Sequence, residues 1–272
     1  MGIVLAITNQ KGGVGKTTTS INLAASLAAT NRKVLLIDLD PQGNATTGSG
    51  IDKSDLEYSI YDVLVDGVTV SESISEATTA GYDLLAANVD LTGAEMEMID
   101  LSRREYRLRD ALKPIKDRYD YIIMDCPPSL SLLTINGLVA ADAAIIPMQC
   151  EYFALEGLTA LMTTIDRITG NLNPELEIEG IVRTMYDPRN SLTRDVSGQL
   201  IEHFGDKVYR TVIPRNVRLA EAPSFGLPIL YYDKQSRGAK AYLALAGEIN
   251  RRYESKDLVK RQLENDSKGV EP

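Results

Sequence analysis

Residues 11–18 read Lys-Gly-Gly-Val-Gly-Lys-Thr-Thr and come directly after the apolar run of residues 2–8, Gly-Ile-Val-Leu-Ala-Ile-Thr. The apolar run predicts a strand, and the largely apolar residues 18–29 predict a helix after the loop. Glycine carries no Cβ, so the three glycines let backbone N–H groups crowd around phosphate oxygens, and a following helix N-terminus adds a favourable dipole. The stretch therefore predicts a phosphate-binding loop between a strand and a helix.

The loop carries two lysines, although one bound nucleotide needs only one. Lys16 is where a P-loop lysine reaches the β- and γ-phosphates, and the Thr17 hydroxyl is then a ligand for Mg²⁺. The strict pattern asks for glycine where this chain has Gln10, so the assignment depends on the Gly-Lys-Thr core and its context. The alternative is a glycine-rich turn with two solvated lysines. Where Lys11 points decides between an ordinary nucleotide binder and a nucleotide-driven dimer switch.

Short apolar, β-branched runs alternate with helical patterns along the chain. Such runs, separated by helices, indicate a mostly parallel twisted sheet with helices on both faces. The predicted fold class is therefore a single α/β domain of the P-loop NTPase type. Strands are expected at residues 4–7, 34–37, 121–124, 144–147, 181–182 and 208–213, with an extra one near 82–85, while the rest of 51–110 looks like helices and loops.

Polar or turn residues follow nearly every predicted strand. Open α/β sheets bind ligands at the carboxyl ends of their strands, so these clusters predict one shared site. Asp125 ends an apolar run, which is the Walker B arrangement for holding Mg²⁺ directly or through water. Of Asp38 and Asp40, one is expected to be structural and the other to face the γ-phosphate and orient or deprotonate the attacking water. Asp40 is the better candidate, and an outer-shell Mg²⁺ role for Asp38 is the alternative.

The composition describes a globular chain of 272 residues with 44% hydrophobic residues and a net charge of −9. No stretch of about 18 uncharged apolar residues and no N-terminal signal is visible, which predicts a cytoplasmic protein. Cys126 and Cys150 each end an apolar run and are expected to be buried free thiols. His203 is the single histidine and is expected on the surface, so a Ser–His–Asp or histidine-rich metal mechanism is unsupported.

The negative net charge argues against nucleic acid as a partner, but the charge is unevenly distributed. Residues 183–218 contain seven basic and four acidic residues, a local net charge of +3. A charge run is usually a solvated face, so this stretch alone is weak evidence for an anionic partner.

Several motifs together match one family. The chain resembles the ParA/MinD group of deviant Walker ATPases, and within it the chromosomal ParA proteins of the Soj type. The resemblance covers residues 1 to about 250 and is far more specific than the phosphate loop alone. The matching segments are Asn9-Gln10-Lys11-Gly12-Gly13-Val14-Gly15-Lys16-Thr17-Thr18, Asp38-Leu39-Asp40-Pro41-Gln42-Gly43-Asn44, Asp125-Cys126-Pro127-Pro128-Ser129, Glu151-Tyr152-Phe153-Ala154-Leu155-Glu156-Gly157, and the stretch from Val212 to Ser224.

The resemblance implies a weak ATP hydrolase, dependent on Mg²⁺, that dimerises face to face around two ATP molecules. Lys11 is then the signature lysine, which crosses to the partner's phosphates and stabilises charge as an arginine finger does. Gly12 sits where only a small residue lets the two loops approach. The implied catalytic residues are Lys11, Lys16 and Asp40, the metal ligands are Thr17, Asp40 and Asp125, and the nucleotide contacts are Lys11, Gly12, Gly13, Val14, Gly15, Lys16, Thr17, Thr18, Met185, Pro214, Arg215 and Asn216.

In this family the ATP dimer binds double-stranded DNA without sequence preference, through basic residues on one edge. Arg189 and Arg218 match those positions, and both fall in the basic stretch 183–218. Dimerisation doubles the patch, so modest phosphate contacts become useful binding. The resemblance also implies a ParB-type centromere-binding partner that stimulates hydrolysis, association with the nucleoid, and a role in chromosome or plasmid partition.

Three other functions remain as alternatives. A MinD-like membrane regulator is disfavoured because residues 254–272, beyond a domain at 1–253, look like a frayed polar tail without an apolar stripe. An electron-transfer ATPase resembling the nitrogenase iron protein needs two cysteines that meet across the dimer axis, whereas Cys126 lies beside Asp125 in the nucleotide site. A metabolic ligase or kinase needs a second-substrate pocket, which the sequence does not show.

Overall fold

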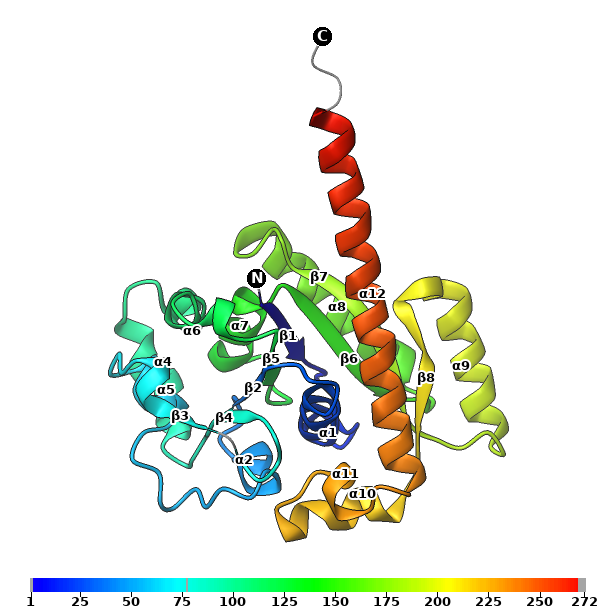
Figure 1. The fold of residues 1–272 in the computed structure, drawn as a ribbon, viewed down its shortest axis with the longest axis horizontal. Coiled ribbons are helices and arrows are strands. Elements are labelled where there is room, and N and C mark those ends of the chain that lie inside the picture. Colours follow the sequence, from blue (N-terminus) through cyan, green and yellow to red (C-terminus); the bar gives the residue numbers. More distant parts are fainter. Residues whose placement is uncertain (1, 77, 269–272) are drawn as a thin grey trace.

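The central feature of the fold is one mostly parallel β-sheet (Figure 1). The computed structural model describes residues 2–76 and 78–268. Within these ranges eight strands form the sheet in the order β3-β4-β2-β5-β1-β6-β7-β8. The strands are β1 (Ile3–Ile7), β2 (Val34–Asp38), β3 (Ile74–Ser75), β4 (Asp83–Leu85), β5 (Tyr121–Asp125), β6 (Ala143–Gln149), β7 (Glu177–Tyr186) and β8 (Val208–Pro214).

All seven predicted strands are present, and their pairings with one another are parallel. The exception in the sheet is β3, which pairs antiparallel with β4 at the edge. The sequence did not predict β3, because two residues are too few for a periodic pattern. The strand order puts β1 between β5 and β6, so the loop after β1 opens at the middle of the sheet.

Helices cover both faces of the sheet, as predicted (Figure 1). They are α1 (Lys16–Ala28), α2 (Asn44–Gly48), α3 (Ile60–Leu64), α4 (Val70–Ser73), α5 (Leu91–Glu97), α6 (Arg107–Leu112), α7 (Leu132–Ala140), α8 (Ala154–Asn171), α9 (Ser191–Phe204), α10 (Val217–Glu221), α11 (Ile229–Tyr232) and α12 (Arg237–Lys268). Short 3₁₀ segments lie at Met98–Asp100, Arg104–Tyr106, Lys116–Arg118, Gly205–Lys207 and Ala222–Phe225. Residues 51–110 are mainly helices and loops, which confirms the prediction.

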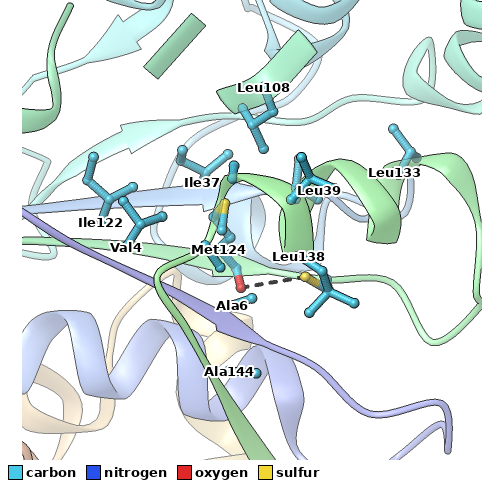
Figure 2. Packing of buried hydrophobic residues seen from close by; sticks show 14 of the residues in the cluster. Val4, Ala6, Ile37, Leu39, Leu108, Ile122, Met124, Leu133, Leu138 and Ala144 are labelled. Carbon is cyan, nitrogen blue, oxygen red and sulfur yellow. Dashed lines mark hydrogen bonds between the residues drawn. The ribbon is translucent and has the colours of Figure 1, made fainter. Parts of the chain in front are cut away.

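The sheet separates two apolar cores. Val4 and Ala6 of β1 point into one core, whereas Leu5 and Ile7 point into the other, since side chains alternate along a strand. Figure 2 shows part of the first core, where side chains from β1, β2, β5 and α7 pack together. The second core contains the apolar faces of α1 and α12. Burial on both faces fixes the strands and leaves their carboxyl ends to carry the loops.

The two cysteines and the histidine lie where the sequence predicts. Cys126 and Cys150 are buried and free, and burial raises the pKa of both thiols. His203 is exposed in the last turn of α9, where its ring packs edge-on against Phe204. None of the three offers a nucleophile or a metal ligand at an open site.

The polar segment at residues 254–272 is helical over most of its length. The helix α12 continues to Lys268, and residues 269–272 lie outside the described part of the chain. Lysine, arginine, glutamate, glutamine and leucine predominate here and have high helix propensity, so polarity alone did not indicate an irregular backbone. The domain boundary at residue 253 stays a prediction.

Candidate functional site

The phosphate loop connects β1 to α1 at the middle of the sheet (Figure 1). Gly13 and Gly15 have φ values of 72° and 89°, a left-handed conformation that favours glycine. Gly15 is the N-cap of α1, so the first N–H groups of this helix open into the loop. Backbone donors and the helix dipole thus meet in one concavity, which suits a phosphate anion.

Lys16 begins α1 and lies inside this loop with only 7% of its surface exposed. Its Nζ donates a hydrogen bond to the carbonyl oxygen of Lys11 at 3.3 Å, so the side chain folds back across the loop. Burial lowers the pKa of Lys16, while the nearby charges of Asp125 and Asp40 act in the opposite direction. A phosphate oxygen in the loop adds a strong acceptor for this buried ammonium group.

Asp125 ends β5 and is fully buried beside the loop. The Ser20 hydroxyl of α1 donates to its Oδ1 at 2.8 Å, whereas its Oδ2 has no hydrogen-bond partner among the described residues. Burial, and then the charge of Asp38, raises the pKa of this carboxyl group, and the adjacent Thr17 hydroxyl lowers it. The described residues include no cluster of three or more His, Cys, Asp or Glu suited to a metal. An orphaned carboxylate oxygen next to a hydroxyl nevertheless fits Mg²⁺, which takes most of its ligands from water and phosphate.

Asp38 and Asp40 have different surroundings. The N–H and the hydroxyl of Thr46 both donate to Asp38 Oδ2 at 2.8 Å, and the Asp40 N–H donates to its Oδ1 at 3.1 Å. Asp38 therefore fixes the chain after β2. Asp40 is half-buried and accepts a hydrogen bond from the Gln42 N–H at 2.9 Å. Because its charge acts on the pKa of Lys16, Asp40 is the carboxylate that faces the phosphate loop.

A cavity of about 330 Å³ lies beside the phosphate loop. Gly15 and Thr18 line it on the loop side, and the residues expected to contact the base line it on the other: Met185, Pro214, Arg215 and Asn216. Met185 has a φ of 48°, which non-glycine residues rarely adopt, and such backbone conformations cluster at ligand sites. The cavity has the size and the largely apolar wall that suit a nucleobase.

Lys11 lies on the outer side of the loop. Its Nζ forms an ion pair with Oε2 of Glu151 at 2.8 Å, and both side chains are about half exposed. Gly12 is also exposed, and a Cβ added there would meet no atom within 4 Å. Within one chain, neither a second lysine nor a glycine at residue 12 is therefore required by packing.

Some residues that fix the loop were not predicted from the sequence. The Thr184 hydroxyl near the end of β7 donates to the carbonyl oxygen of Val14 at 2.7 Å. Asn9 accepts from the Lys11 N–H at 2.9 Å and donates to the carbonyl oxygen of Pro147 at 2.8 Å. Polar residues at strand ends were a usable signal for Thr184. Nothing in the sequence pairs Asn9 with a residue 138 positions away.

The basic stretch 183–218 does not form a uniform surface. Arg183 is buried and donates to the Ser197 hydroxyl and to the Tyr209 carbonyl oxygen, both at 2.8 Å. Counting Arg183 toward a surface charge was therefore wrong, because a strand-borne arginine can point inward and satisfy backbone carbonyls. The other six basic side chains of the stretch are exposed.

Arg189 and Arg218 lie beyond the carboxyl ends of the neighbouring strands β7 and β8. Arg189 makes a two-pronged ion pair with Asp187, at 2.9 and 2.7 Å. Arg218 pairs with Glu221 at 2.8 Å. Exposed ion pairs contribute little free energy, so a phosphate group can replace either carboxylate.

Comparison with known proteins agrees with this geometry. Residues 2–178 match the family described as an AAA domain. The sporulation initiation inhibitor protein Soj of Bacillus subtilis is 55% identical over 92% of this chain and 98% of its own length. The chromosome partitioning protein ParA of Caulobacter vibrioides is 56% identical over 90% of this chain and 93% of its own length. The chain belongs to the ParA/MinD-type family.

A solved structure shares the fold of this ParA/MinD-type chain. Cobyrinic acid a,c-diamide synthase from Mycobacterium smegmatis, with bound ADP and magnesium, matches with a TM-score of 0.83 and 39% identity. The match covers 94% of this chain and 97% of that one. The fold class and the family expected from the motifs are thus confirmed. The described part of the chain has no helix with the length and apolar character needed to cross a membrane.

Proposed function

We propose that this protein is an ATP-dependent dimer switch that binds DNA without sequence preference and drives chromosome or plasmid partition with a ParB-type partner. The observation that carries the proposal is the division of the two lysines. Lys16 occupies the phosphate loop, whereas Lys11 lies outside it beside Glu151. The relative named for chromosome partitioning and the neighbour with bound ADP and magnesium support the proposal.

The proposed chemistry follows from the charges around the loop. Lys16 and the loop N–H groups hold the β- and γ-phosphates, and Thr17 and Asp125 hold Mg²⁺, which neutralises charge on the phosphate oxygens. Asp40 orients the attacking water and accepts its proton. Lys11 of the partner subunit adds a second cation to the transferring phosphoryl group.

Gly12 supports a dimer of this kind. Its exposed backbone has no neighbour that would clash with a Cβ, so packing within one chain gives no reason for glycine there. A second chain that approaches the loop closely gives such a reason, because a side chain at residue 12 would keep the two phosphate loops apart.

The proposal is tested by measuring oligomeric state and DNA binding with ATP, with ADP and without nucleotide. A dimer and DNA binding that both appear only with ATP support it. A protein that stays monomeric with ATP contradicts it. An amide-forming synthase, the function in the name of the M. smegmatis protein, is the second candidate, and DNA has no role in it.

Replacement of Asp40 by alanine is expected to trap the ATP-bound dimer. The variant keeps Lys16 and the loop glycines, so it binds ATP, but it loses the group that accepts the proton from water. Loss of a general base typically slows a reaction by about 10²- to 10⁴-fold. Turnover should therefore fall by at least about 100-fold, and sizing chromatography with ATP should show a persistent dimer.

The matched control is Asp40→Asn, which keeps an acceptor for the Gln42 N–H but cannot take a proton. If the carboxylate acts as a base, Asp40→Asn turns over as slowly as Asp40→Ala. Near-normal turnover by the asparagine variant would assign Asp40 to loop geometry alone.

The double variant Arg189→Ala with Arg218→Ala is expected to lose DNA binding while keeping the ATP dimer. Each arginine releases its carboxylate partner to bind a phosphate, and each lost phosphate contact reduces the slope of log K against log salt by about 0.9. Binding of a duplex should weaken at least about tenfold at moderate salt, as measured by fluorescence anisotropy over a salt series.

Arg167→Ala is the control for this experiment, because Arg167 is an exposed arginine of α8, away from the ends of β7 and β8. It should bind DNA as the unaltered protein does. If the double variant still binds DNA with the same salt slope, the DNA surface lies elsewhere.

A further inference from the structure

Two large aromatic side chains are exposed next to the phosphate loop. Tyr152 and Phe153 join β6 to α8 and have 75% and 66% of their surfaces exposed. Their rings stack edge to face with centroids 5.0 Å apart, so they form one apolar surface. Single exposed apolar residues are ordinary, but adjacent stacked aromatics on a loop favour an interaction site.

Three successive residues of the phosphate loop are tied to the segment that carries these rings. Asn9 donates to the carbonyl oxygen of Pro147 in β6 at 2.8 Å. The Gln10 side chain donates to the Thr164 hydroxyl of α8 at 3.0 Å. Lys11 pairs with Glu151, directly before Tyr152, at 2.8 Å. The loop and the β6–α8 connection are therefore one unit, and nucleotide in the loop is felt at the aromatic pair.

Leu130 extends the same surface on the other side of Gln10. It is half exposed in the connection between β5 and α7, and it borders one small crevice together with Gln10 and Thr164. We define the docking face as Leu130, Tyr152 and Phe153. Apolar side chains thus lie on both sides of the first residues of the phosphate loop.

We propose that the docking face binds a second copy of this chain and is the apolar part of the ATP-dependent dimer interface. This inference rests on the proposed function, in which Lys11 serves the partner's nucleotide. A lysine on the outer side of the loop can reach that nucleotide only if the loop edge is buried against the partner. The docking face lies on that edge.

Charge also favours an identical partner. Lys11 and Glu151 carry opposite charges 2.8 Å apart beside the aromatic pair, so the face is locally neutral. In a two-fold dimer the same patch meets itself, and a locally neutral patch does so without like-charge repulsion. Burial of Tyr152 and Phe153 from both copies removes on the order of 500 Å² from water, a substantial part of a standard interface.

The test compares Tyr152→Ser with Phe153→Ser in one chain against Met96→Ser. Met96 is an equally exposed apolar residue, at 76%, on α5 and remote from the phosphate loop along the chain. With a slowly hydrolysed ATP analogue, sedimentation should show dimerisation of the double variant weakened at least about tenfold, and that of Met96→Ser unchanged. Binding of the analogue to the monomer, followed by fluorescence at low protein concentration, should stay within about twofold for both.

The outcomes separate the inference from the function beneath it. If the unaltered protein dimerises and the double variant dimerises equally well, the docking face is wrong and the proposed function stands. If the unaltered protein stays monomeric with the analogue, the proposed function fails and the inference fails with it. A double variant that dimerises normally but no longer responds to a ParB-type protein would assign the face to that partner and overturn the inference.

Crosslinking gives a test that does not depend on weakening the fold. Cys126 and Cys150 are buried, so a bismaleimide should react mainly with a thiol introduced by Tyr152→Cys. Crosslinked dimer should form with the ATP analogue and not with ADP. The same reagent with Met96→Cys should give little product in either state. Equal yields from both variants, or no nucleotide dependence at Tyr152→Cys, would overturn the inference.

Discussion

Replacement of Lys16 by alanine is expected to weaken ATP binding by about 100-fold or more. The ammonium group lies inside the loop with 7% of the residue exposed, and a phosphate bound there would be its main ionic partner. Removing one partner of a buried charge pair costs about 2–5 kcal/mol, and 1.4 kcal/mol corresponds to a factor of ten. Calorimetric titration with ATP and with ADP measures the loss directly.

The folded protein itself should tolerate this change. Burial already lowers the pKa of Lys16, which means that the empty loop stabilises its charge poorly. The melting temperature without nucleotide should therefore change little, whereas the rise that ATP causes should disappear. Lys113→Ala, a change at an exposed lysine, is the control and should keep that rise. ATP affinity equal to that of the unaltered protein would contradict the assignment of the loop.

The sheet and the centre of the site could be predicted from the sequence because both depend on local patterns. Buried parallel strands need near-continuous apolar runs, and residues 34–37 and 121–124 are such runs, which the structure confirms as β2 and β5. Parallel strands also bring their carboxyl ends to one edge. That rule placed Asp125 beside Lys16 without any knowledge of which strands are neighbours.

Features that depend on distant contacts could not be predicted in this way. Arg183 counted as surface charge, although its donors are used by Ser197 and the carbonyl of Tyr209. The partner of Lys11 is 140 residues away in the sequence, so its ion pair depends on the packing of β6 beside β1. The sequence also left Asp38 and Asp40 undecided. The hydrogen bonds from Thr46 to Asp38 distinguish them, and no local pattern contains that information.

Replacement of Lys11 by alanine is expected to leave ADP binding intact while the ATP dimer, DNA binding and hydrolysis are lost. Its ion pair with Glu151 is half exposed, so its removal costs only about 0–1 kcal/mol of stability. A cation that acts on the transferring phosphoryl group contributes about 10³- to 10⁵-fold to turnover, so the loss of activity should be of that order. Sedimentation, DNA binding and turnover measured on one preparation test all three losses.

The control variant Glu151→Gln decides what Lys11 is for. If the lysine only holds Glu151, and through it the β6–α8 connection, then removing either partner breaks the same contact, and both variants fail alike. If instead Lys11 serves a phosphate, Glu151→Gln leaves the lysine free to do so, and dimerisation and turnover persist. A double-mutant comparison sharpens this result, because Lys11→Ala should then be equally inactive whether residue 151 is glutamate or glutamine. Loss of the ATP dimer in Glu151→Gln would show that the ion pair itself is the functional contact.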